Sequence, residues 1–359
     1  MTSRERILST FRGEEVDRFP VWLKMANDTW QSSQPEPYRS MGAAELLRQC
    51  GCDAMLRCGV RVKSEAPHVK GTVTQENGLR RTVTETPDGV LVGEQVLDPY
   101  TNSWHPTKFP ADTPERLAAL RWLFRDTTYH VDPTDAAKAR ERQQILVEQD
   151  VVTTAGIGPG PIMDLVENEC GPENTFFMMH DVPELFDEVV ALMHEARMRH
   201  LRALMPHMPT DTFWLTENTS TSLISPTIFR QYCMPHLTAY GRLIQEHGII
   251  AVHHMCGTLN ALLEMIDELP AEVNEAYTTR PLGDVSLAEG RRRMPSKALI
   301  GGTNATLWLS APENILATVA ADLAACPDRR KIFLTSAGVL PPVVNFEKAR
   351  TVVEGLKRL

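Results

Sequence analysis

From residue 114 onward, segments of helical periodicity alternate with short apolar segments, and this alternation limits the fold more than any other feature. Strands that alternate with helices pair in parallel through right-handed crossovers. Two further apolar segments with their own helices precede this region. Roughly eight such units predict an α/β fold, a closed (β/α)8 TIM barrel, with a doubly wound open sheet as the alternative. The predicted strands cover residues 18–23, 53–58, 151–157, 213–217, 249–254, 272–276, 298–302 and 331–335.

Residues 70–98 follow a different pattern. Apolar and polar residues alternate there around two turn sequences, Glu76-Asn77-Gly78 and Pro87-Asp88-Gly89, which is typical of β-hairpins. We interpret this segment as a β-hairpin insertion near the N-terminus of one TIM-barrel domain over residues 1–359. Barrels of this kind reach such a length as a single domain.

Two helix starts are indicated by capping patterns. Asp181 with Glu184 resembles a capping box that opens a long helix. Ser225-Pro226 combines a capping side chain with a proline in the first turn, and it predicts a second helix start.

The overall charge and the cysteines exclude several classes of protein. A net charge of -9 argues against nucleic acid as a partner, because binding phosphates needs a basic surface. Apolar runs stay shorter than the ~20 residues that cross a bilayer, and the N-terminus lacks a signal-peptide core. Seven irregularly spaced cysteines do not suggest a disulfide framework. We therefore expect a cytoplasmic protein that binds neither nucleic acid nor membrane.

Polar residues at the ends of the predicted strands are the candidate site residues, because barrel active sites form where strands end and loops begin. In chain order they are Lys24, Arg57 with Cys58, Gly158, Glu217, His254 with Cys256, Glu275, Thr303 with Asn304, and Ser336.

His254-Met255-Cys256-Gly257 carries the most specific signal. Alternate side chains of a strand share a face, so His254 and Cys256 are expected to point the same way. Nitrogen and sulfur donors suit Zn²⁺. The alternative is a core cysteine beside a hydrogen-bonded histidine. Glu217 and Glu275 end the two neighbouring strands, and either is a candidate metal ligand or catalytic base; a structural salt bridge is the alternative for both.

Arg57 and Arg61 follow the second predicted strand and are candidates for holding an anionic group of the substrate through forked hydrogen bonds. Plain surface ion pairs are the alternative. Asn304, at another strand end, is a further candidate for substrate binding.

The chain as a whole resembles the uroporphyrinogen decarboxylase superfamily, and within it the corrinoid-dependent methyltransferase branch. A (β/α)8 barrel is the fold that this resemblance implies. The matching segments, in chain order, are Ser3–Arg6, Asp17–Val21, Ile224-Ser225-Pro226 with Phe229 and Pro235, Gly283-Asp284-Val285, Leu299–Gly302, and residues 338–355.

Two comparisons select the branch. The decarboxylases carry an Arg-Gln-Ala-Gly-Arg stretch near the N-terminus and an aspartate after the second strand, whereas this chain has Trp22–Ala26 and Leu56–Gly59 there. The methyltransferases carry His-x-Cys followed by a distant Gly-Cys, and His254 with Cys256 match the first part. Gly338-Val339 stands where the last cysteine is expected, so Val339 cannot be a ligand. The resemblance then implies either a carboxylate ligand, with Glu217 as first choice, or no metal.

The resemblance implies transfer of a methyl group between a small molecule and a corrinoid cobalt, with zinc as Lewis acid. A carboxylate in place of a thiolate makes the metal harder and favours oxygen partners, so we expect demethylation of a methoxylated aromatic (O-demethylation). Methylation of a thiol by a methylcobamide is the alternative. The corrinoid signature Asp-x-His-x-x-Gly is incomplete, with Val252 in place of the aspartate, so a separate corrinoid protein is the expected partner. A homodimer is compatible with the sequence.

Two rival functions remain. A uroporphyrinogen decarboxylase-like lyase would act without metal, and a binding barrel without catalytic activity would be insensitive to loss of His254.

Overall fold

The computed structural model describes residues 1–100 and 102–359, and its contacts divide the chain into two compact units. The first unit consists of Met1–Gly59, Ala137–Ile157 and Pro209–Leu359. The second consists of Val60–Ala136 and Gly158–Met208. The expectation of one domain over residues 1–359 stays a prediction.

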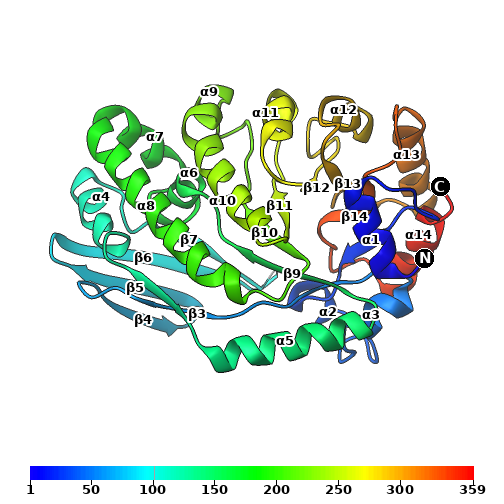
Figure 1. Ribbon diagram of the computed structural model, residues 1–359, viewed down its shortest axis with the longest axis horizontal. Coiled ribbons are helices and arrows are strands. Elements are labelled where there is room, and N and C mark those ends of the chain that lie inside the picture. Colours follow the sequence, from blue (N-terminus) through cyan, green and yellow to red (C-terminus); the bar gives the residue numbers. More distant parts are fainter. Residues whose placement is uncertain (101) are drawn as a thin grey trace. The chain divides into compact units, whose positions relative to one another are not determined.

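The first unit contains eight parallel strands that form a nearly closed barrel (Figure 1). Neighbouring strands follow the order β1-β14-β13-β12-β11-β10-β9-β2. The predicted (β/α)8 TIM barrel is therefore confirmed, and the open doubly wound sheet is not formed. The strands are β1 (Val21–Lys24), β2 (Met55–Arg57), β9 (Val152–Ile157), β10 (Thr212–Thr216), β11 (Ile250–His254), β12 (Val273–Tyr277), β13 (Ala298–Gly302) and β14 (Ile332–Val339).

Helices follow the strands of this unit. Ser225 caps the helix that starts at Pro226, as predicted. None of the helices in the described part of the chain has both the length and the apolar character needed to cross a bilayer. The helices are α1 (Ser3–Arg12), α2 (Asp28–Gln31), α3 (Ala43–Cys50), α5 (Pro133–Glu148), α9 (Pro226–Ile228), α10 (Met234–Glu246), α11 (Leu263–Glu268), α12 (Leu287–Arg293), α13 (Pro312–Ala324) and α14 (Phe346–Leu356), with short segments η4 (Phe229–Cys233), η5 (Asn260–Leu262) and η6 (Leu307–Leu309).

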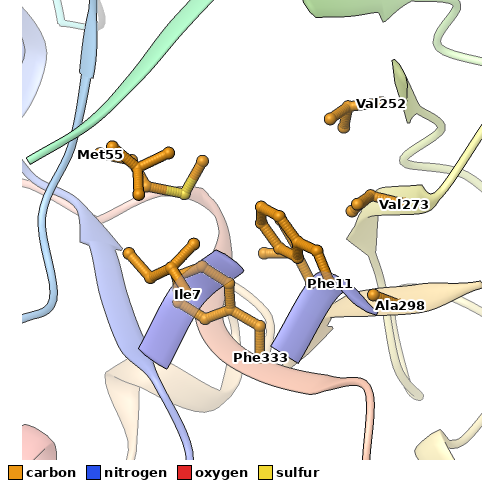
Figure 2. Packing of buried hydrophobic residues seen from close by; sticks show 9 residues of the cluster. Ile7, Phe11, Met55, Val252, Val273, Ala298 and Phe333 are labelled. Atoms are coloured by element: carbon orange, nitrogen blue, oxygen red, sulfur yellow. The ribbon is translucent and has the colours of Figure 1, made fainter. Parts of the chain in front are cut away.

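In the core of the barrel, side chains of helix α1 pack against side chains of the strands. Figure 2 shows Ile7 and Phe11 of α1 beside Phe333 of β14, and the rings of Phe11 and Phe333 lie 6.0 Å apart. Val252 of β11 and Val273 of β12 belong to the same fully buried cluster. Because alternate residues of a strand share a face, the burial of Val252 directs His254 of the same strand toward the barrel interior.

Asp53 fastens the seam of the barrel, where β1 and β2 stand at the two ends of the strand order. Its backbone N–H donates to the carbonyl of Val21 at 2.7 Å, and its carboxylate accepts from the Val21 N–H at 2.9 Å. The same carboxylate, 1% exposed, pairs with Arg6 at 2.5 Å and Arg18 at 2.8 Å. Charge-assisted contacts thus hold a seam that ladder hydrogen bonds do not.

The second unit contains a four-stranded antiparallel sheet and a two-stranded one. The predicted hairpin segment forms three strands of the larger sheet, and a fourth strand extends it. The strands are β3 (Val62–Glu65), β4 (Lys70–Glu76), β5 (Leu79–Thr86), β6 (Gly89–Asp98), β7 (Ser103–Lys108) and β8 (Thr128–Val131). The helices are α4 (Pro114–Leu120), η1 (Arg121–Leu123), α6 (Pro161–Asp164), η2 (Leu165–Glu169), α7 (Pro172–Asp181), α8 (Pro183–Leu204) and η3 (Met205–His207).

The capping box expected at Asp181 and Glu184 is wrong. Asp181 is the last residue of α7, so its backbone is already helical. Helix α8 starts after Val182, and no side chain caps it.

Candidate functional site

His254 and Cys256 lie together where β11 ends. His254 is the last residue of the strand, and the Cys256 side chain hydrogen-bonds its imidazole. The exposed Cys256 thiol also donates to Oδ1 of Asn218 at 3.5 Å. We call these two side chains the His–Cys pair. The structure therefore brings together the two residues that the sequence placed on one face.

A close approach of two loops fixes the turn after this pair. A Cβ on Gly257 would lie 2.8 Å from the backbone of Ser220 in the loop after β10, so a glycine is required there. Thr258 N–H then donates to the Ser220 hydroxyl at 3.1 Å. The loop that carries Cys256 is thus held against its neighbour both by the contact of Thr258 with Ser220 and by that of Cys256 with Asn218.

Glu275 of β12 lies behind His254 and orients it. Its carboxylate hydrogen-bonds Nδ1 of His254 through one oxygen, and Nζ of Lys24 pairs with the other oxygen at 2.5 Å. The residue is fully buried. Directly after it, Ala276 adopts a left-handed φ of 58° at a bulge between β12 and β13, which turns the chain at this carboxylate.

Neighbouring charges determine the protonation states of Glu275 and His254. Burial alone would raise the pKa of Glu275, but the charges of Lys24 and His254 hold it below its ordinary value. Burial alone would lower the pKa of His254, but the charge of Glu275 and the hydrogen bond with Cys256 raise it to about 9. Glu275 is therefore an ionised carboxylate that positions His254.

A pocket of about 610 Å³ opens beside the His–Cys pair, within the first unit. His254, Thr216 and Val339 line it together with Trp22 and Trp214. Its volume is in the ordinary range for small-molecule sites. The pocket lies at the carboxyl ends of the strands, where barrels of this kind place their active sites.

Glu217 directly follows β10, and its backbone N–H donates to the carbonyl of His254 at 3.0 Å. Thr216, not Glu217, is the register partner of His254, and it is Thr216 that lines the pocket. Glu217 is buried. Burial of the Cys233 thiol and the charge of Glu217 both raise the pKa of this thiol, which places Glu217 near segment η4. Its expected role as ligand or base stays a prediction.

The three candidates for substrate binding have different surroundings. Arg57, at the end of β2, lines the pocket. Arg61 belongs to the second unit, where its backbone N–H donates to Asp135 at 2.8 Å. The Asn304 amide donates to the carbonyls of Thr279 and Arg280, and its oxygen accepts from the backbone of the next turn. This placement favours a structural role for Asn304.

Sequence reasoning missed three lining residues. Trp22 and Trp214 come from β1 and β10, and Arg142 comes from α5. The two tryptophans resemble core residues of apolar strands, and Arg142 belongs to a highly charged helix whose arginines all resemble surface residues. Trp22 and Trp214 each lie two residues before the end of their strand, and this position was the usable signal.

The donor types of the His–Cys pair fit zinc, but their number is short of a complete site. Because Nδ1 of His254 is bonded to a carboxylate, Nε2 is the atom that would bind a metal, after losing the proton that it carries below a pKa of about 9. Catalytic zinc sites have three protein ligands. Among the described residues, no group of three or more His, Cys, Asp or Glu side chains is placed to hold a metal ion.

Comparison with known proteins identifies the family. The model of the family described as uroporphyrinogen decarboxylase (URO-D) matches residues 146–359, which is more than half of the chain. The chain belongs to the uroporphyrinogen decarboxylase family. A search of curated proteins found no match.

One solved structure agrees with the barrel of this URO-D family member. A methyltransferase from Methanosarcina mazei is similar over 100% of this chain and 99% of its own, with 15% identity and a TM-score of 0.63. At this identity the likeness establishes the fold. A B12-independent methionine synthase from Shewanella sp. W3-18-1, solved with selenomethionine, covers 88% of this chain and 83% of its own, with 11% identity and a TM-score of 0.44.

Proposed function

We propose that this URO-D family member is a methyltransferase that moves a methyl group between a small molecule and the corrinoid cobalt of a separate protein. The observation that carries the proposal is the His–Cys pair at the pocket rim, with an ionised carboxylate behind the histidine. The fold likeness to a methyltransferase supports it. The expected direction is O-demethylation of a methoxylated aromatic.

Zinc is the proposed metal, with His254 and Cys256 as two ligands and Glu217 as the proposed third. When bound, zinc would act as a Lewis acid on the oxygen or sulfur of the small molecule. Glu275 holds the His254 ring at Nδ1 and so would direct Nε2, once it has lost its proton, to the metal, and Lys24 keeps Glu275 ionised.

In O-demethylation the bond between the methyl carbon and the aryl oxygen would break, and the reduced cobalt supplied by the partner would accept the methyl group. The released phenolate takes a proton from solvent. Trp22, Trp214, Thr216 and Val339 line the pocket together with His254. These residues bind and orient the donor but do not exchange its protons.

Metal analysis of the purified protein tests the zinc proposal most directly. We expect close to one zinc per chain, lost in His254→Ala and Cys256→Ala. Cys326→Ala is the matched control, because this partly exposed cysteine does not line the pocket and its thiol donates to the backbone carbonyl of Asp322. A protein without zinc, or equal zinc in Cys256→Ala and Cys326→Ala, would refute the assignment.

Methyl transfer is tested separately by mixing the protein with a Co(I) corrinoid protein and a methoxylated aromatic. Formation of the methyl-cobalt spectrum, abolished by Cys256→Ala, is the expected result. Release of carbon dioxide from a carboxylated substrate without metal would favour a decarboxylase instead. Decarboxylation is the reaction for which the family is described.

A further inference from the structure

Two guanidinium groups in the barrel pocket have no carboxylate partner. Arg57 ends β2, Arg142 lies on α5, and both line the pocket. Arg142 donates to the carbonyl of Gly59 at 3.0 Å, and neither arginine forms an ion pair with any residue that the structure describes. Lys24, a third cation of the lining, is already neutralised by Glu275.

This excess of positive charge is unusual for the chain, whose net charge is -9. Guanidinium groups that converge on a pocket without a carboxylate partner recognise planar anions, since their N–H groups match the two oxygens of a carboxylate. The two arginines therefore indicate an anionic group on the ligand.

Two indole rings form a corner in the same pocket. Trp22 of β1 and Trp214 of β10 meet edge to face, with ring centroids 6.2 Å apart and planes at 82°. The indole N–H of Trp214 donates to Thr212 at 3.0 Å, so the orientation of this ring is fixed. Both residues are partly buried against the core cluster. Such a corner offers a face and an edge to an aromatic ring of the ligand.

We infer that the pocket binds an aryl carboxylate, with the carboxylate on Arg57 and Arg142 and the ring in the corner of Trp22 and Trp214. The inference rests on the proposed function in one respect, namely that the methyl ether of this ligand faces the His–Cys pair. Arg142 is then a specificity-determining residue, because it lies on a helix outside the strand ends and contacts no reacting atom.

Direct binding measured by calorimetry tests the inference without zinc or cobalt. The probes are 3,4-dimethoxybenzoate, the neutral 3,4-dimethoxybenzyl alcohol, and acetate. We expect the benzoate to bind at least about tenfold more tightly than the alcohol, which lacks the charge-assisted hydrogen bonds. Acetate, which lacks the ring, is expected to bind more weakly than either.

Variants then locate the contacts. Arg142→Gln is expected to weaken benzoate binding about tenfold and to leave alcohol binding unchanged. Arg140→Gln is the matched control, because Arg140 lies on the same helix, is exposed and does not line the pocket. Trp214→Leu is expected to weaken both aromatic probes. If that variant does not fold, the acetate comparison still tests the need for a ring.

The outcomes separate this inference from the proposed function. Equal affinity for benzoate and alcohol, or an Arg142→Gln variant that binds benzoate like the Arg140→Gln variant, overturns the inference even if methyl transfer occurs. Arg142-dependent benzoate binding in a protein that holds no zinc and transfers no methyl group supports the inference and refutes the proposed function.

Discussion

Replacing Asp53 by asparagine tests whether a single carboxylate closes the barrel. Asparagine keeps the shape of the side chain and one oxygen that can accept from the Val21 N–H, but it removes the charge and replaces the oxygen that accepts from Arg6 and Arg18 by an N–H donor. The carboxylate is 1% exposed and pairs with Arg6, whose side chain is 6% exposed, and with Arg18, at 23%.

The expected cost follows from these contacts. Breaking a buried ion pair costs about 3–5 kcal/mol. Arg6 keeps its second partner, Asp17, at 2.7 Å, and Arg18 is partly hydrated, so the lower end applies. We expect Asp53→Asn to lower the free energy of unfolding by about 3 kcal/mol.

Urea denaturation measures this loss, and hydrogen exchange of the Val21 amide locates it at the seam. Asp17→Asn is the control, because Asp17 pairs with the same arginine but its side chain is 42% exposed. Its loss should cost less than about 1 kcal/mol. If the two variants lose equal stability, or Asp53→Asn stays within about 0.5 kcal/mol of the parent, the seam does not depend on this charge.

Three further predictions concern other parts of the chain. Burial and the charge of Asp164 raise the pKa of Glu169 to about 8, so the folded state holds a proton that the unfolded chain releases near pH 4.5. Stability should therefore fall as the pH rises from about 4.5 to 8, and Glu169→Gln should flatten this slope and raise the stability at pH 7 by about 1–3 kcal/mol in pH-dependent denaturation. A Cβ at Gly301 would lie 2.2 Å from the carbonyl oxygen of Tyr277, so Gly301→Ala should cost at least about 1–3 kcal/mol, and a thermal melt equal to the parent's would show that the strands can move apart. Val339→Cys adds a thiol to the pocket that His254 lines, so zinc should resist a competing chelator better than in the parent; unchanged zinc release would mean that position 339 does not reach the metal.

The barrel could be predicted from the sequence because its strands are short apolar runs separated by helices, a local pattern. The strand at residues 298–302 was predicted to the residue, and the spacing of His254 and Cys256 was enough to place both at one strand end. For these residues, the positions expected from the local sequence pattern agree with those in the tertiary structure.

The remainder of the site depends on contacts between distant segments. Alternation along β10 stops at Thr216, and Asn218 has a left-handed φ of 48°, so the direction of Glu217 could not be derived from its place after the strand. Arg142 lines the pocket from helix α5 and lies 85 residues after Arg57 in the sequence. Nothing in its local sequence distinguishes it from the neighbouring Arg140. The sheet around residues 70–108 was recognised as hairpins, but its fourth strand lacks a turn signal of the expected type.

The second unit interrupts the barrel sequence twice, once after β2 and once after β9, and β9 is the single strand between the two excursions. Neither unit is therefore a continuous stretch of chain. A cut at any one boundary would divide the first unit between two fragments, and an engineered barrel without the second unit would need two new junctions, one on each side of β9. During translation, the second unit is synthesised as two separate segments, and strand β9 of the barrel is synthesised between them.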